Sequence, residues 1–309
     1  MRVVFMGTPK IASGILQELI DNEYNVVAVV TQPDKKVGRK QIITKSAVKE
    51  TAEKFNIPVI QPKKIRDEYK EILDYKPDII ITCAYGQIVP NEILEYPKYK
   101  CINIHGSLLP KYRGGSPIQT AIKNGEEYTG ITIMYMAEKM DAGDMLVKEK
   151  VKIEDDDTTE TMFDKLENCG KHLLIRTLPK LINNQIVPEK QNENNVTFAW
   201  NIKKEEEYIN FNRSTKDVYN HIRSLISWPV GYAIIDGKKT KFHKVTKLNE
   251  ILGKPGEFIG LIDNMIAIGT NDGTILVEEI QMEGKSKQLS KVFYNGVGRK
   301  LIGKLYDFK

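Results

Sequence analysis

The sequence has little cysteine and no long apolar run, and each shortage excludes a class of protein. The three cysteines, Cys83, Cys101 and Cys169, have neither the close spacing of a zinc site nor the even count of a disulfide framework. No apolar run approaches the roughly 18 residues of a membrane span, and the run from Val3 to Met6 is too short for a signal-peptide core. We therefore expect a soluble protein of the reducing cytoplasm, without a metal site.

Several catalytic and nucleotide-binding motifs are also missing. The first turn, Gly7-Thr8-Pro9-Lys10, lacks the G-x-G-x-x-G fingerprint of dinucleotide-binding folds. No G-x-x-x-x-G-K-[ST] loop and no G-x-S-x-G nucleophile elbow occurs. The sequence therefore offers neither the phosphate-binding loop of a nucleotide site nor the turn that presents a serine nucleophile.

Length and charge distribution indicate two domains. The chain has 309 residues, which is more than one domain usually contains. Hydrophobic residues make up 41% of it, enough to form ordinary buried cores. Periodicity fades between residues 186 and 207, so we expect domains over 1–185 and 208–309 with a linker between them. Residues 1–200 hold 28 basic and 28 acidic side chains, whereas residues 201–309 hold 18 and 13. A basic second domain fits contacts with phosphates, although such an excess also serves solubility alone.

Hydrophobic patterns predict an α/β first domain and a β-rich second one. Short β-branched runs alternate with helical patterns, which is typical of a Rossmann-like, mostly parallel sheet covered by helices. Five short runs separated by turn signals then predict a small OB-like β-barrel after one helix. The expected strands are 2–6, 26–30, 58–60, 79–83, 101–105, 130–136, 233–235, 241–245, 257–261, 265–268 and 274–280, and the expected helices are 10–20, 46–55, 157–183 and 214–225.

The segment from Cys101 to Pro117 carries the strongest chemical signal. Asn103 and His105 lie two residues apart on a predicted strand, so their side chains share one face. Gly106 interrupts the strand and places the pair at its carboxyl end, where open α/β sheets bind ligands. Asp141 follows another predicted strand and can reach the same edge. Alone, the Asn-x-His pair is more simply explained as two satisfied polar residues at a strand end.

An amide, an imidazole and a carboxylate at one edge suit the transfer of an acyl group between nitrogens. Asn103 can donate to the oxyanion of a tetrahedral intermediate. His105 can stabilise that oxyanion or carry a proton, and Asp141 can orient the imidazole. No covalent nucleophile is needed for such a transfer.

With the downstream run Asp141-Ala142-Gly143-Asp144, the segment from Asn103 to Gly114 resembles the signature of the folate-dependent formyltransferases. The resemblance covers nearly the whole chain and implies Asn103, His105 and Asp141 as catalytic residues. It implies 10-formyltetrahydrofolate as the formyl donor and no metal. The residues implied to bind the donor are Tyr85, Gly86, Gln87, Ile88, Val89, Ser107, Leu108, Leu109 and Pro110.

The acceptor is indicated by the basic segment from Thr31 to Lys40. Taken alone it reads as a solvated charged loop. It nevertheless resembles the inserted loop with which the tRNA-acting branch of the family approaches the acceptor stem. That resemblance implies methionyl initiator tRNA as the acceptor, with formylation serving translation initiation, and a monomer without an obligate protein partner. The residues implied to bind tRNA are Lys35, Lys36, Arg39 and Lys40.

Two other functions stay open at this point. An amino-sugar nucleotide formyltransferase can share the three catalytic side chains, but the basic loop argues against it. A non-catalytic RNA-binding protein on an old enzyme fold is disfavoured because all three side chains are present. The chain departs from the family at Ile209-Asn210-Phe211 and at Asn201, which weakens claims about tRNA contacts near the domain junction. We interpret Phe211 and Trp228 as packing residues, and the three histidines other than His105 as structural or surface residues.

Overall fold

The computed structural model describes residues 1–38 and 41–307. They form two compact units. The first unit comprises Met1–Pro117, Tyr128–Lys152 and Phe163–Trp200, and the second comprises Ile118–Glu127, Ile153–Met162 and Asn201–Lys309. These units follow packing rather than chain order, so the contiguous domain boundaries expected from the sequence stay a prediction.

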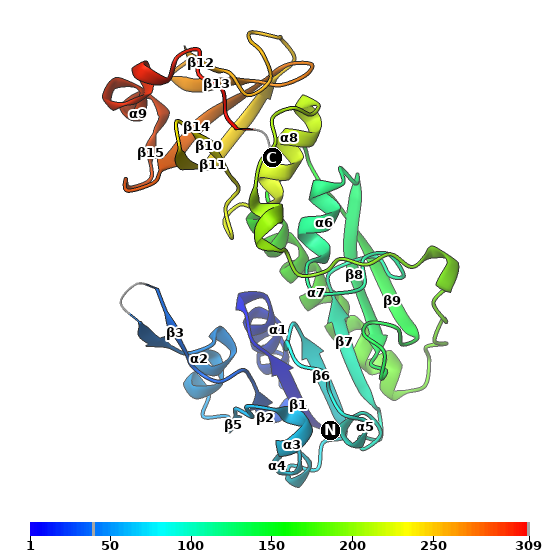
Figure 1. The fold of residues 1–309 in the computed structure, drawn as a ribbon. Coiled ribbons are helices and arrows are strands. Elements are labelled where there is room, and N and C mark those ends of the chain that lie inside the picture. Colours follow the sequence, from blue (N-terminus) through cyan, green and yellow to red (C-terminus); the bar gives the residue numbers. More distant parts are fainter. Residues whose placement is uncertain (39–40, 308–309) are drawn as a thin grey trace. The chain divides into compact units, whose positions relative to one another are not determined.

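The first unit is built on a seven-stranded sheet in the order β5-β2-β1-β6-β7-β8-β9 (Figure 1). Pairing is parallel from β5 to β7 and antiparallel at β8 and β9, which confirms the mostly parallel, Rossmann-like fold. The strands are β1 (Arg2–Gly7), β2 (Asn25–Val30), β5 (Val59–Ile60), β6 (Ile79–Cys83), β7 (Cys101–His105), β8 (Tyr128–Tyr135) and β9 (Met145–Lys152).

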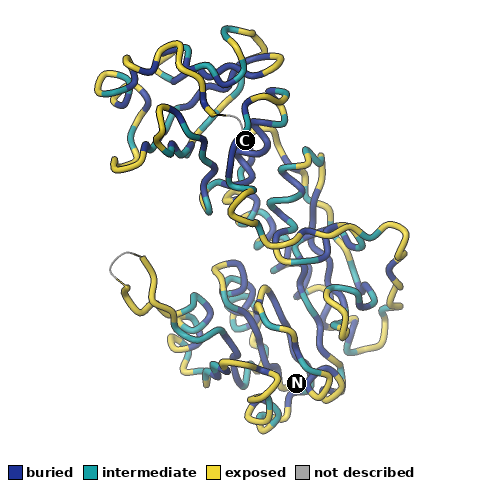
Figure 2. Tube along the Cα trace, in the orientation of Figure 1, coloured by how far each residue is buried: buried dark blue, intermediate teal, exposed yellow. Residues whose placement is uncertain are grey.

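Helices cover both faces of this sheet. On one face, Gly170 of the long helix α7 lies against Ile15 of α1 and against Ile104 and Ile131 of the sheet. On the other face, Val4 belongs to a buried hydrophobic cluster that includes residues of the short helices α3, α4 and α5. Every residue of β6 is buried, as its unbroken apolar run predicts (Figure 2). The helices are α1 (Lys10–Asp21), α2 (Ala47–Lys54), α3 (Ile65–Glu68), α4 (Lys70–Asp74), α5 (Asn91–Leu94) and α7 (Thr159–Ile182).

The second unit contains a six-stranded antiparallel sheet in the order β10-β11-β14-β13-β12, with β15 added to β14. Its eleven-residue strand β11 shifts register around His243, and such irregularities bend a sheet. The result is a curled half-barrel, consistent with the OB-like prediction. The elements are β10 (Tyr232–Ile235), β11 (Lys238–Leu248), β12 (Phe258–Ile262), β13 (Met265–Gly269), β14 (Thr274–Met282), β15 (Gln288–Leu289), α6 (Pro117–Lys123), α8 (Thr215–Ser224) and α9 (Ser290–Gly296).

An aromatic cluster fills the core of the half-barrel. Phe211 contacts Phe242 edge-on and Tyr306 at a tilt, with ring centroids 5.5 and 5.3 Å apart. Phe211 is 1% exposed, so the prediction that it packs is confirmed. Trp228 is 71% exposed, so the same prediction for Trp228 is wrong. Within the described residues, no helix combines the length and apolar character needed to cross a membrane.

Candidate functional site

Strand β7 delivers the two polar side chains that the sequence singles out. It pairs with β6 on one side and β8 on the other, so its carboxyl end lies inside the sheet. Asn103 is partly exposed, whereas His105 is only 6% exposed. The alternation of buried apolar residues around them, Ile102 and Ile104, keeps Asn103 and His105 on the opposite face.

Asp141 joins this pair from the loop between β8 and β9. Its Oδ1 lies 3.5 Å from Asn103 Nδ2, and its Oδ2 lies 3.7 Å from His105 Nδ1. The backbone N–H of Gly114 donates to the same Oδ2 at 2.8 Å. The three residues predicted to be catalytic therefore lie together, although 38 positions separate Asn103 from Asp141.

The imidazole of His105 has a fixed orientation. Its Nε2 lies 2.9 Å from the backbone carbonyl oxygen of Tyr112. A carbonyl oxygen can only accept, so Nε2 carries a hydrogen and donates it. Nδ1 is consequently the nitrogen that faces Asp141 and is available for proton transfer. Ser107 Oγ supports the same loop by donating to the carbonyl of Lys111 at 2.7 Å.

Thr82 of β6 orients Asn103, and sequence reasoning missed it. Its hydroxyl donates to Asn103 Oδ1 at 2.8 Å. The amide nitrogen of Asn103 then points toward the carboxylate of Asp141, whereas the flipped amide would set two oxygens against each other. A lone threonine in the apolar run from Ile79 to Cys83 was the available signal.

Residues 85–89, implied to bind the donor, follow β6 directly. Tyr85 is 4% exposed, and its hydroxyl is one of three buried side-chain polar atoms of the described residues that have no hydrogen-bond partner. Burial raises the pKa of Tyr85. Gly86 has φ of 91°, a conformation that favours glycine, and Ile88 is 70% exposed. Gln87 Oε1 accepts from the N–H of Ile65 at 2.9 Å, which ties the segment to α3.

The segment Ser107–Pro110 is held against β8. Thr132 Oγ1 donates to the carbonyl of Ser107 at 2.7 Å and accepts from the N–H of Leu109 at 3.1 Å. Ser107 and Leu109 are buried, while Leu108 and Pro110 are partly exposed. The structure therefore holds this loop beside the carboxyl end of β7, and donor contacts by either segment remain a prediction.

The basic segment forms a hairpin. Strand β3 (Lys35–Val37) pairs antiparallel with β4 (Ile42–Thr44), where the sequence predicts only an irregular loop. Lys35 and Lys36 are exposed. Arg39 and Lys40 lie outside the described residues.

Polar contacts anchor the start of this hairpin. Asp34 accepts from Lys49 Nζ at 2.8 Å and from Gln61 Nε2 at 2.9 Å, and these bonds lower the pKa of Asp34. Gln32 Nε2 donates to the carbonyl of Tyr85 at 3.1 Å. The hairpin therefore begins beside the segment implied to bind the donor.

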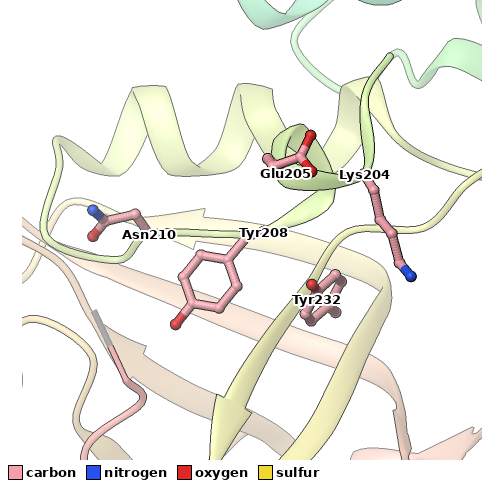
Figure 3. Close-up of a pocket in the computed structure, with 5 residues that line it drawn as sticks. All are labelled: Lys204, Glu205, Tyr208, Asn210 and Tyr232. Atoms are coloured by element: carbon pink, nitrogen blue, oxygen red, sulfur yellow. The ribbon is translucent and has the colours of Figure 1, made fainter. Parts of the chain in front are cut away.

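A pocket of about 460 Å³ lies in the second unit. The rings of Tyr208 and Tyr232 meet edge-on in it, and Lys239 Nζ lies 3.5 Å from the centre of the Tyr232 ring. The pocket contains none of the predicted site residues. Its lining residues are Lys204, Glu205, Tyr208, Asn210 and Tyr232 (Figure 3).

Among the residues 1–38 and 41–307, no group of three or more His, Cys, Asp or Glu side chains is arranged to hold a metal ion.

Comparisons with known proteins identify the family. Residues 1–178 match the model of the family described as formyl transferase, and residues 201–298 match that of the formyl transferase C-terminal domain. A methionyl-tRNA formyltransferase of Bacillus cytotoxicus is 49% identical over 311 residues, covering 97% of this chain and 98% of that protein. One of Bacillus mycoides is also 49% identical, covering 99% and 98%.

Solved structures share the fold. HypX from Aquifex aeolicus in complex with tetrahydrofolic acid has a TM-score of 0.70 at 20% identity, covering 100% of this chain, which spans about half of HypX. Methionyl-tRNA formyltransferase from Clostridium thermocellum has a TM-score of 0.58 at 22% identity, covering 81% of this chain and 94% of that one. The two family models and the 49% identical relatives show that the chain belongs to the formyl transferase family and, within it, to the methionyl-tRNA formyltransferases.

Proposed function

We propose that this protein transfers the formyl group of 10-formyltetrahydrofolate to the α-amino group of methionine carried by initiator tRNA, in the cytoplasm, for translation initiation. One observation carries the chemistry: Asn103, His105 and Asp141 meet at the carboxyl end of β7. The names of the 49% identical relatives support the choice of methionyl-tRNA as the acceptor.

The reaction forms one C–N bond and breaks another. The neutral amine of methionine attacks the formyl carbon and gives a tetrahedral intermediate with an oxyanion. Asn103 Nδ2 stabilises this oxyanion by donating a hydrogen bond, and His105 assists it through Nδ1. Collapse of the intermediate releases N10 of the folate, which takes up the proton that the attacking amine loses. The products are formylmethionyl-tRNA and tetrahydrofolate.

Asp141 and the backbone prepare these groups. The carboxylate of Asp141 helps to hold the imidazole of His105 in one orientation, because it faces Nδ1 at 3.7 Å while Nε2 donates to the carbonyl of Tyr112. The N–H of Gly114 fixes the carboxylate itself. The arrangement therefore resists rotation of the imidazole during the reaction.

The tRNA is held by electrostatic contacts from the hairpin, through Lys35, Lys36, Arg39 and Lys40, and from the basic stretch of residues 201–309. Lys35 and Lys36 support this proposal because both are exposed on a strand that carries no acidic residue.

The decisive assay measures formyl transfer from 10-formyltetrahydrofolate to three acceptors: methionyl initiator tRNA, uncharged initiator tRNA and an amino-sugar nucleotide. Wild type and Arg39→Ala are compared. We expect transfer to the charged tRNA alone, with weaker activity for Arg39→Ala. Transfer only to the amino sugar would keep the chemistry of Asn103, His105 and Asp141 but overturn the acceptor, and release of no tetrahydrofolate with any acceptor would overturn both.

A further inference from the structure

A segment that reads as linker in the sequence fastens the loops around the site. Residues 189–199, here called the strap, run along the first unit. Glu189 and Met145 exchange two backbone hydrogen bonds of 2.8 Å. Farther along, Arg113 donates to the carbonyl of Thr197 at 2.9 Å, and Ala199 donates to the carbonyl of Arg113 at 2.7 Å. The strap thus touches the Asp141 loop at one end and the Arg113 loop at the other.

Gln191 joins these two loops with one side chain. Its Nε2 donates to the carbonyl of Asp141 at 2.7 Å and to the carbonyl of Gly143 at 2.8 Å. Its Oε1 accepts from Arg113 Nε at 3.0 Å. Gln191 is 9% exposed, and a buried amide with all these groups satisfied holds its neighbours in one arrangement.

Arg113 completes the connection from the other side. It is 4% exposed, and its guanidinium pairs with Glu193 of the strap at 2.8 Å. The next residue, Gly114, gives its N–H to Asp141 Oδ2. Asp141 is therefore fixed at its carboxylate through Gly114 and at its carbonyl through Gln191.

Asp141 needs such support because its backbone has φ of 50°, a left-handed conformation that side chains with a Cβ disfavour. Relaxation of this residue would turn its carboxylate away from His105 and Asn103. The same loop packs closely against β8 at Gly143, where a Cβ would lie 1.9 Å from the carbonyl oxygen of Tyr135. Only glycine fits at this position.

We propose that Gln191 is a positioning residue for formyl transfer, which holds the carboxylate of Asp141 in register with Asn103 and His105. The inference rests on the proposed function. It predicts an effect on turnover rather than on binding, because a carboxylate displaced by about 1 Å loses much of its value in the transition state while substrate contacts elsewhere persist.

The test uses Gln191→Glu in the full chain. Glutamate keeps the shape and the acceptor for Arg113 but cannot donate to the carbonyls of Asp141 and Gly143. We expect kcat with methionyl initiator tRNA to fall by about tenfold or more, while both Michaelis constants stay within about twofold. Gln185→Glu, an exposed glutamine just after α7, is the matched control and should turn over like wild type.

A double-mutant cycle separates positioning from general damage to the fold. If Gln191 acts through Asp141, adding Gln191→Glu to Asp141→Asn should change the single-turnover rate by less than about twofold. A full tenfold loss in that background, or wild-type turnover of Gln191→Glu, would overturn the inference. Should Gln191→Glu not fold, Gln191→Asn, too short to span both loops, enters the same cycle with the same expectations. If the wild-type protein forms no formylmethionyl-tRNA, the proposed function and this inference both fail. If the wild type is active and Gln191→Glu turns over equally fast, only the inference fails.

Discussion

The imidazole of His105 offers only Nδ1 to the reaction, because Nε2 donates to Tyr112. Replacing His105 by alanine should therefore lower kcat by roughly 10²- to 10⁴-fold, the usual range for a lost acid–base or oxyanion-stabilising group. The KM for tRNA should change little, since the proposed role belongs to the transition state. Steady-state kinetics check this, with His172→Ala on the exposed surface of α7 as control. Full turnover of His105→Ala would exclude the imidazole from the mechanism.

The hydroxyl of Thr82 is expected to affect turnover by fixing the orientation of the Asn103 amide. Thr82→Val keeps the shape of the buried side chain but removes the donor to Asn103 Oδ1. We expect kcat to fall by about tenfold, because the amide of Asn103 can then flip and present oxygen instead of N–H.

Thr129→Val is a matched control for this change. Thr129 is also buried, lies on β8 of the same sheet, and its hydroxyl has no hydrogen-bond partner among the described residues. It should keep wild-type turnover and lose no stability in thermal unfolding. Equal kinetic losses in both variants would mean that the threonine hydroxyl of Thr82 does not act through Asn103.

Asn103 and His105 were predictable because the period of two along a strand places them on one face. Residues that reach the site from distant loops carried no such signal. The N–H of Gly114 and the side chain of Gln191 act through contacts that depend on the path of the chain, and Gln191 lies in a stretch rich in Asn, Gln, Glu and Lys that reads as linker.

Among the elements, those with a clear period and caps were predictable. Helix α8 begins after Ser214, whose side chain accepts from the N–H of Asp217, and the sequence predicts it to within a residue at each end. Strand β9 was missed because Lys148, Lys150 and Lys152 make its sequence resemble that of a solvent-exposed loop. Its charged residues suit the edge of the sheet, where β9 lies.

The hairpin was missed for a different reason. A two-stranded hairpin has no hydrophobic core of its own, so its sequence need not alternate apolar and polar residues, and that pattern cannot be used to recognise it. Val37, Ile42 and Ile43 are 54–68% exposed. What fixes its start is the polar contact of Asp34 with Lys49, which sequence alone does not reveal.

Replacing Lys35 and Lys36 together by alanine should test the hairpin as a unit. Loss of two phosphate contacts should raise the KM for tRNA by about tenfold at low salt and leave kcat nearly unchanged. The salt dependence should also weaken, by a slope of about 1 for each contact in a plot of log KM against log salt concentration. Lys63→Ala with Lys64→Ala, an exposed lysine pair before α3, is the control. An unchanged KM and slope in the hairpin variant would remove the two lysines from the tRNA site.

At the scale of the whole molecule, the proposed function assigns tRNA recognition to residues 201–309, which carry the excess of basic side chains. It assigns formyl transfer to the site within residues 1–200. One buried histidine makes the stability of the second unit depend on pH. His221 lies on α8 in the second unit, 7% exposed, with Nε2 donating to the carbonyl of Glu206 at 2.7 Å. Burial lowers the pKa of His221 to about 4, with Lys123 and Arg213 adding to the effect and the hydrogen bond to Glu206 opposing it.

A folded-state pKa below the unfolded value of 6.5 means that the unfolded chain binds more protons between about pH 4 and 6.5. The free energy of unfolding should therefore be highest above pH 6.5 and fall as pH drops toward 4, by roughly 3 kcal/mol from this group. His221→Gln can keep the hydrogen bond to Glu206 but cannot titrate, so it should lose less stability than wild type over this range. Denaturant unfolding at several pH values checks this, and His172→Gln should behave like wild type. Parallel losses in wild type and His221→Gln would show that other groups govern acid unfolding.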